Sequence, residues 1–145
     1  MTSHTACELC SQPGGDIVYR HEKFRVVLVD DAQYPGFCRV IWDAHVKEMT
    51  DLPAPDRTLF MAAVWQVEMA IRQVMQPDKM NVASLGNMTP HMHWHVIPRY
   101  AGDAHFPGPV WAEVQRTASV TDLMARKALL PLLHQSIIRA MDQVL

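Results

Sequence analysis

The stretch PHMHWHVIPRY, residues 90–100, carries three of the eight histidines of the chain at every second position. These residues are His91, His93 and His95. Alternation of this kind is typical of a β-strand, because successive side chains of a strand point to opposite faces of its sheet. We therefore expect the three imidazoles to share one face, and the apolar residues between them to pack into a core on the other face.

Three explanations of the alternating histidines are open. One is a half-exposed strand whose polar face happens to consist of histidine, although surface strands usually draw on Thr, Lys, Arg and Glu. Another is a metal ion bound by all three imidazoles, but same-face neighbours on one strand lie about 6.5–7 Å apart, a wide spacing for a single ion with bonds of about 2.0–2.1 Å. We favour the third, a division of labour among the three side chains.

The rest of the chain predicts several strands and two helices. Segments rich in β-branched and aromatic residues predict strands at DIVYR (16–20), EKFRVVLVDD (22–31), FCRVIW (37–42), KMNVASLG (79–86) and HMHWHVIP (91–98). Residues 54–76 predict a long helix, because Pro55 suits a first turn and apolar residues recur every three or four positions. That apolar stripe comprises Phe60, Val64, Val67, Ile71 and Met75.

The ends of the chain are less regular. The opening dozen residues look turn-like, a final helix is expected from Pro131 through Met141, and residues 112–130 carry no clear pattern. These elements predict an α+β fold, with an antiparallel sheet of about five strands, the long helix packed on it, and a C-terminal helix. We expect one domain over residues 1–145, with a core at about 7–111 and a helical extension at 112–145.

Composition narrows the class of protein. With a net charge of -2 over 145 residues, the chain has no basic field for a nucleic-acid backbone, so we expect no nucleic-acid partner. No apolar run approaches the roughly 20 residues of a membrane span, so we expect no membrane partner. The polar opening, MTSHTACELCSQPGG, lacks the apolar centre of a secretory signal, and three cysteines suit a reducing compartment better as thiolates than as disulfides. We expect a cytoplasmic protein.

Two motifs resemble a known family. HMHWHVIPR resembles the His-x-His-x-His-x-x signature of the histidine triad (HIT) superfamily of nucleotide hydrolases and transferases, and residues 81–111 are similar to its small bacterial branch described as diadenosine-tetraphosphate-hydrolase-like. VLVDDAQYPGFCRVIWDAH, residues 27–45, matches the strand–turn–strand that comes earlier in that family. The resemblance covers about residues 7–111 and implies a HIT-like fold.

The resemblance implies roles for two of the histidines. His93 would be the nucleophile that attacks an α-phosphorus and forms a nucleotidyl-imidazole intermediate, and His95 would donate to the phosphate or to its bridging oxygen. Water would then release a nucleoside monophosphate. This chemistry suits an imidazole, which is largely neutral at pH 7 and keeps a nucleophilic nitrogen without a separate base.

Residues with other polar side chains are implied as substrate contacts. Asp30 occupies the place where the family binds ribose hydroxyls, and Asp31 could take that role instead. Asn87, with the main-chain NH groups of its Gly-containing turn, is a candidate for the phosphate, and Asn81 is a weaker one. Each of these residues also has an ordinary explanation as a turn former or a strand-end residue.

The first histidine is implied to bind metal. In zinc-containing relatives, the uridylyltransferases among them, a Cys-x-x-Cys pair joins two histidines, and the matching residues here are Cys7, Cys10, His45 and His91. Two thiolates and two imidazoles make a closed, structural zinc site. A redox pair and two ordinary thiols are the alternatives for the cysteines, and His4 is the chief rival for one ligand position. Cys38, inside FCRVIW, reads as a small buried apolar residue.

The sequence therefore predicts an enzyme: a homodimeric nucleotidyl hydrolase that cleaves dinucleoside polyphosphates or other AMP conjugates at a phosphoanhydride or phosphoramide bond. Two alternatives are a nucleotide-binding protein with little catalysis and a nucleotidyltransferase that passes the covalent intermediate to a phosphorylated acceptor. The enzyme is favoured over the binder because His93 and His95 are both present. The transferase is less favoured because the uridylyltransferases have Gln where this chain has His95.

Overall fold

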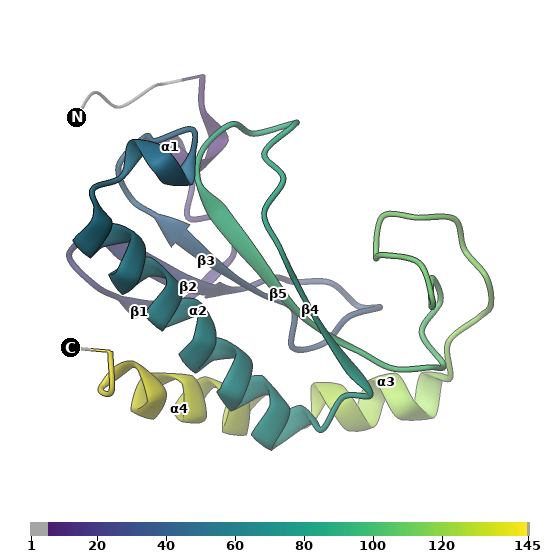
Figure 1. Cartoon of the computed structure of the whole chain (residues 1–145). Helices are drawn as coiled ribbons and strands as arrows, with labels where there is room; N and C mark the ends of the chain where they lie inside the picture. The colour runs from purple at the N-terminus through teal and green to yellow at the C-terminus, as the bar shows by residue number, and fades with distance from the viewer. Residues whose placement is uncertain (1–5, 145) are drawn as a thin grey trace.

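A five-stranded antiparallel sheet with the strand order β1-β2-β3-β5-β4 forms the centre of the molecule (Figure 1). The computed structural model describes residues 6–144. The strands are β1 (Asp16–Arg20), β2 (Phe24–Leu28), β3 (Cys38–Trp42), β4 (Lys79–Ala83) and β5 (His93–Arg99). The helices are α1 (Glu8–Ser11), the 3-10 helix η1 (Met49–Asp51), α2 (Ala54–Met75), α3 (Val120–Lys127) and α4 (Leu130–Met141). The predicted α+β fold, with its five strands and long helix, is confirmed.

The long helix α2 covers one face of the sheet (Figure 1). Pro53 and Pro55 fit its start, because proline has no N–H to lose there, and Gln76 ends it in the left-handed conformation with φ 48. The predicted stripe of apolar residues is buried against the strands. At about 25 cal/mol per Å² of buried apolar surface, this stripe is a principal source of the stability of the fold.

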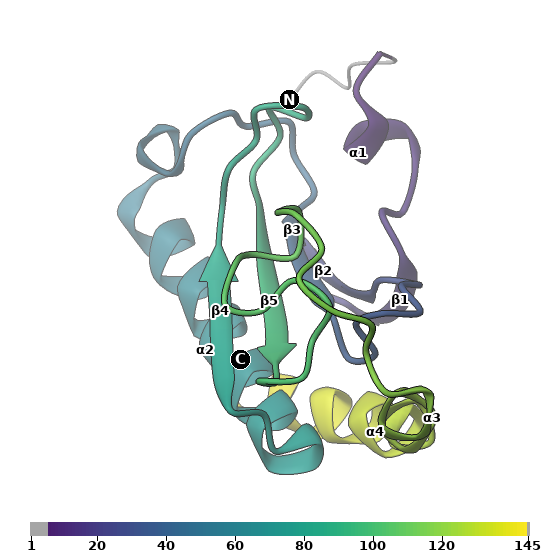
Figure 2. The same cartoon turned by 90° about the vertical axis from the view of Figure 1, so that its right-hand side faces the viewer.

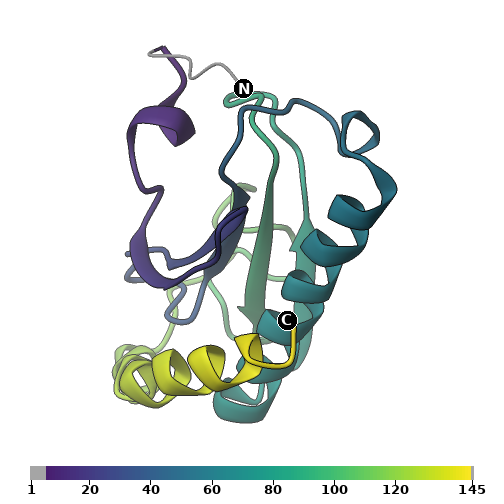
Figure 3. The same ribbon diagram turned by 90° about the vertical axis from the view of Figure 1, so that its left-hand side faces the viewer.

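The C-terminal helix packs against both α2 and β1, at one end of the sheet (Figure 3). Leu133, Ile137 and Met141 lie one turn apart on its inner side and are fully buried. The structure also contains a helix, α3, in the region that carried no clear pattern. Ser119 is its N-cap, and the Ser119 hydroxyl accepts a hydrogen bond from the backbone N–H of Asp122.

The structure differs from the sequence prediction at several places: the strands predicted at 22–31 and 79–86 are shorter, at Phe24–Leu28 and Lys79–Ala83, and the regions of α1 and β5 also differ. Residues 8–11 form a short helix, α1, where a turn-like start was expected. Strand β5 begins at His93, whereas the prediction began it at His91. His91 therefore lies just before the strand. Trp94 and Val96 pack toward α2 as predicted, together with Met92.

Two separate segments pack on the face of the sheet away from α2 and partly cover it. The segment before β1 packs Leu9 on Val27 and Ile41, while Tyr34 and Phe37 pack on Ile97. Figure 2 shows the chain after β5 looping back over this same side of the sheet. The side chains of β3 and β5 that lie between the two segments are therefore the ones able to form a site.

None of the helices in the described part of the chain combines the length and the apolar composition that crossing a membrane requires.

We predict that Gly36→Ala lowers the free energy of unfolding by roughly 1–3 kcal/mol. Gly36 adopts φ +94, and an added Cβ would lie 3.1 Å from Met75 Cε and 3.3 Å from Pro98 Cγ, so both the backbone and the packing of α2 on β5 would be strained. Urea denaturation measures the change. Gly102→Ala is the matched control, because a Cβ there meets no atom of residues 6–144 within 4 Å. Equal stability of the two variants would contradict the prediction.

Candidate active site and metal centre

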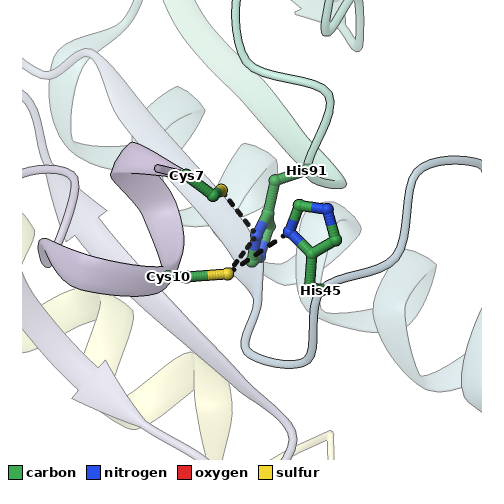
Figure 4. Close-up of side chains that lie close together, drawn as sticks. All are labelled: Cys7, Cys10, His45 and His91. Carbon is green, nitrogen blue, oxygen red and sulfur yellow. Dashed lines mark hydrogen bonds between the residues drawn. The ribbon is translucent and has the colours of Figure 1, made fainter. Parts of the chain in front are cut away.

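Four side chains from three parts of the chain meet beside the end of β3 (Figure 4). Cys7 and Cys10 come from the segment around α1, His45 from the loop after β3, and His91 from the residues just before β5. Their ligand atoms all lie within 4.8 Å of one another. The predicted set of Cys7, Cys10, His45 and His91 is thus brought together, whereas His4, the proposed rival, lies outside the described residues.

The spacing of these atoms suits a tetrahedral ion. His91 Nδ1 lies 3.4 Å from Cys7 Sγ and 3.5 Å from Cys10 Sγ, and His45 Nδ1 lies 3.3 Å from Cys10 Sγ. A tetrahedron with Zn–S bonds of about 2.3 Å and Zn–N bonds of about 2.0–2.1 Å has S···N edges of about 3.5 Å. Two thiolates and two imidazoles also leave no open coordination position. The donor set and its geometry therefore fit a structural zinc ion.

The second nitrogen of His91 fixes its ring. Nε2–H donates to the carbonyl oxygen of Trp42 at 2.5 Å, which leaves Nδ1 without a proton on the side of the two sulfur atoms. Only 1% of the residue is exposed, and burial lowers the pKa of His91, so the imidazole is neutral at pH 7. This is the form that binds a metal ion.

A buried arginine holds the cysteine segment against the sheet. Arg25 Nε donates to Pro13 O at 2.9 Å, and its NH2 group donates to Leu9 O at 2.8 Å and Gln12 O at 3.2 Å. Its NH1 group pairs with Asp43 at 2.6 Å, which balances the buried charge. The segment that carries the two cysteines is thereby fixed by main-chain contacts as well as by its apolar packing.

His93 faces a hollow with one nitrogen already in use. Its Nδ1–H donates to the carbonyl oxygen of His91 at 2.6 Å, so Nε2 is the nitrogen left for a ligand. Ser84 Oγ in turn donates to His93 O at 2.7 Å and fixes the main chain of the strand. Burial lowers the pKa of His93, so the ring is neutral and Nε2 keeps its lone pair at pH 7.

His95 lies beside His93 on the same face, with ring centroids 4.9 Å apart and planes at 86°. Its Nδ1 is buried and has no hydrogen-bond partner within residues 6–144. Since a buried acceptor without a partner costs less than a buried donor, the proton belongs on Nε2, where it can reach a ligand. Burial is the main cause that lowers the pKa of His95 to about 4, with smaller effects from His93 and Arg39.

We call the depression in front of these two rings the histidine hollow. It has a volume of about 430 Å³, within the usual size range of small-molecule sites. Its lining residues come from β3, β5, the β4–β5 loop and the returning chain after β5: Arg39, Leu85, Gly86, Asn87, Met88, Thr89, His93, His95 and Trp111. Two neutral imidazoles, an amide and a guanidinium therefore face one space, an arrangement suited to an anion with a reactive centre.

The candidate substrate contacts divide in the structure. Asn87 lines the histidine hollow, and its contact with a phosphate stays a prediction. Asn81 is not among the residues that line the hollow. The Asn81 Oδ1 atom accepts a hydrogen bond from Arg99 at 2.8 Å. Asp30 is exposed and lines a different depression of about 290 Å³ next to α3, so its contact with a ribose stays a prediction. Asp31 accepts a hydrogen bond from the N–H of Gln33 at 2.9 Å, as an ordinary turn residue does.

The sequence prediction missed Arg39 as part of the site. Arg39 is the one charged residue of the apolar strand segment FCRVIW, and it lies two residues before Ile41, so both side chains are expected on the same face of the sheet. Because β3 and β5 pair antiparallel with Arg39 opposite His95, the guanidinium lies on the histidine face. The register of the two strands, which the sequence does not specify, was needed to see this.

Comparisons with known proteins agree with this geometry. The family model described as HIT domain matches residues 12–102. An AP-4-A phosphorylase of Mycobacterium tuberculosis is 30% identical over 102 residues, which cover 66% of this chain and 52% of that protein. The chain thus spans about half the length of the curated relatives it matches.

Several solved structures share the fold. A histidine triad protein from Marinobacter aquaeolei is 26% identical with a TM-score of 0.71, covering 94% of this chain and 99% of that one. A histidine triad protein from Bradyrhizobium japonicum is 28% identical with a TM-score of 0.69, covering 84% and 91%. A Zn-bound histidine triad family protein from Mycobacterium smegmatis, 24% identical with a TM-score of 0.55 over 90% and 97%, is similar in fold alone.

The metal centre predicts a zinc content that depends on Cys10. We expect about one zinc ion per chain in the purified protein and almost none in Cys10→Ala, together with a loss of roughly 2–5 kcal/mol in the free energy of unfolding. Elemental analysis by mass spectrometry and urea denaturation measure the two quantities. Cys38→Ala is the control for metal content, because Cys38 is buried in the core under α2. Equal zinc in the Cys10 and Cys38 variants would refute the assignment.

The pKa of His95 predicts how stability changes with pH. An unfolded chain takes up the proton near the ordinary value of about 6.5, whereas the folded chain takes it up only at about 4, so the free energy of unfolding decreases as the pH falls between these two values. His95→Gln removes this contribution. Denaturation at pH 7 and pH 5 should therefore show a larger loss in the unchanged protein than in the variant, and equal losses would contradict the pKa shift.

Proposed function

The chain belongs to the HIT domain family, and from this membership we propose that it is a nucleotidyl hydrolase in which His93 is the nucleophile. The observation that carries the proposal is the orientation of His93. Its Nδ1–H is bound to the carbonyl of His91, and its neutral ring lines the histidine hollow beside a second imidazole. A nucleophile needs this combination of fixed tautomer, free lone pair and open approach.

The proposed reaction has two displacement steps at the α-phosphorus. Nε2 of His93 attacks first, so that an N–P bond forms while the P–O bond to the leaving group breaks. The carbonyl of His91, hydrogen-bonded to Nδ1–H, stabilises the positive charge that the ring gains. Water then attacks the same phosphorus, the N–P bond breaks, and a nucleoside monophosphate and a proton are released.

Neutral donors meet the charge on the phosphoryl oxygens in this scheme. His95 offers the single N–H of its neutral ring, since the pKa near 4 leaves it without a second proton at pH 7. Gly86 and Asn87 of the β4–β5 loop also line the hollow, and in this scheme they would supply main-chain N–H groups and a side-chain amide. In the proposed function zinc has a structural part: when bound, it holds His91 in place.

The substrate class is a nucleotide joined to a leaving group, and we propose dinucleoside polyphosphates or other AMP conjugates. The similarity to an AP-4-A phosphorylase supports this class. The same similarity favours a second candidate, in which inorganic phosphate and not water attacks the intermediate. Diadenosine tetraphosphate would then give ADP and ATP in place of AMP and ATP.

We further propose that the protein acts as a cytoplasmic homodimer. Trp65 and Met69 lie one turn apart on α2 and are 48% and 58% exposed, an apolar pair that a second copy would cover. Within residues 6–144 none of the three cysteines forms a disulfide, in keeping with a reducing compartment. Sedimentation equilibrium tests the dimer: a monomer mass at micromolar concentration would end this part of the proposal.

We predict that His93→Ala lowers the rate of diadenosine tetraphosphate cleavage by about 10³-fold or more, because the variant has no nucleophile. Chromatography of the nucleotide products, with and without added phosphate, measures the rate and identifies the acceptor. His134→Gln on α4 is the control and should keep full activity. Retained activity of His93→Ala would reject the proposed function. Nucleotide binding by the unchanged protein without any turnover would support the alternative of a binding protein.

A further inference from the structure

We propose that Arg39 binds the phosphate groups of the leaving group and thereby selects substrates with an anionic polyphosphate leaving group over those with a neutral amine. This inference rests on the proposed function and adds a specificity residue to it. Arg39 is on β3, in a different part of the chain from the histidine motif.

The position of Arg39 places it next to the reacting groups. It lies opposite His95 in the pairing of β3 with β5, and the next pair on the same face is Ile41 with His93. Directly opposite residues of an antiparallel pair have Cβ atoms about 4.5–5.5 Å apart, so the Arg39 side chain runs beside the His95 ring. Both side chains line the histidine hollow.

The guanidinium of Arg39 has few partners within the protein. NH1 donates to Gly14 O at 2.9 Å, while Nε is buried and has no hydrogen-bond partner within residues 6–144. Across that same range no carboxylate forms an ion pair with it, although Glu8 attracts its charge through space. Several of the five N–H groups of the fork therefore remain for a ligand.

Two other arginines in this fold show what a purely structural arginine looks like. Arg25 pairs with Asp43 at 2.6 Å and donates to three carbonyl oxygens. Arg99 pairs with Asp103 at 3.0 Å and donates to Asn81 Oδ1 and Gly108 O. Arg39 lacks such a counterion within residues 6–144, and burial without one is unfavourable for its charge. An anion in the hollow would offset that cost.

The aromatic residue Phe37 helps to orient the guanidinium. The Arg39 Cζ atom lies 5.7 Å from the centroid of the Phe37 ring, and the same ring makes an edge contact with His95 at 5.6 Å. The carbonyl of Gly14 holds the NH1 side. A planar fork fixed in this way matches the geometry of phosphate oxygens, which a flexible ammonium group does not.

The chemistry of the leaving group makes Arg39 selective. When the P–O bond of a dinucleoside polyphosphate breaks, the departing polyphosphate gains negative charge, and a fixed guanidinium stabilises it without proton transfer. When the P–N bond of a phosphoramidate breaks, the departing amine needs a proton, which a guanidinium does not release because it stays protonated in proteins. Arg39 therefore favours the first reaction and contributes little to the second.

The test compares two substrates in Arg39→Gln: diadenosine tetraphosphate and adenosine 5′-phosphoramidate. We expect kcat/KM to decrease by about 100-fold for the tetraphosphate and by less than about threefold for the phosphoramidate. Arg39→Lys, which keeps the charge and loses the fork, should give an intermediate decrease for the tetraphosphate. Arg20→Gln, an exposed arginine on β1, is the control and should match the unchanged protein. Equal decreases for both substrates, or none, would overturn the proposal.

A binding measurement separates this proposal from the proposed function. Isothermal titration with inorganic tripolyphosphate should show affinity at least about tenfold weaker in Arg39→Gln than in the unchanged protein, with a change below about threefold for AMP. If the unchanged protein cleaves neither substrate, the hydrolase proposal fails while this titration still decides the role of Arg39. Tripolyphosphate affinity that does not change in Arg39→Gln would overturn that role. Circular dichroism confirms that each variant is folded.

Discussion

The position of His91 is the constraint on which the site depends, because three of its polar atoms face three different parts of the protein. Its Nδ1 meets the two cysteine sulfurs, its Nε2–H is bound to the carbonyl of Trp42, and its own carbonyl accepts the Nδ1–H of His93. The metal centre, the end of β3 and the nucleophile are thus joined through one residue. A shift of His91 would change the tautomer or the aim of His93, and with it the reactive lone pair.

The N-terminal segment extends this constraint across the sheet. From Cys10 it passes over Ile41 to Gly14, which adopts φ +83, and an added Cβ there would lie 2.8 Å from Ile41 Cδ1. This positive φ favours glycine over residues that carry a side chain. The carbonyl of Gly14 then accepts the hydrogen bond from Arg39. A metal that holds the two cysteines in place would therefore also fix the acceptor that orients the arginine of the histidine hollow.

Much of this arrangement could be predicted from the sequence, because it depends on the periodicity of side chains along strands and helices and on the spacing of the metal-binding residues. The alternation of histidines predicted that His93 and His95 share a face, and the helical stripe predicted the face that α2 covers. The cysteine pair with His45 and His91 was inferred from a resemblance and is confirmed as a cluster.

Side-chain partnerships between distant segments could not be predicted. Asn81 engages Arg99, and Arg39 has no counterion in the described chain, because strand register and loop paths decide both. The short helix α1 likewise owes its place to the packing of Leu9 and to Arg25, which local propensity does not encode.

The most direct measurement of the central claim is a crystal structure of the zinc-loaded protein with AMP bound, phased with anomalous data at the zinc edge. We expect one zinc ion on Cys7, Cys10, His45 and His91, and an α-phosphorus about 3–3.5 Å from His93 Nε2. An ion that also binds the His93 ring, or a nucleotide seated away from that nitrogen, would contradict the central claim.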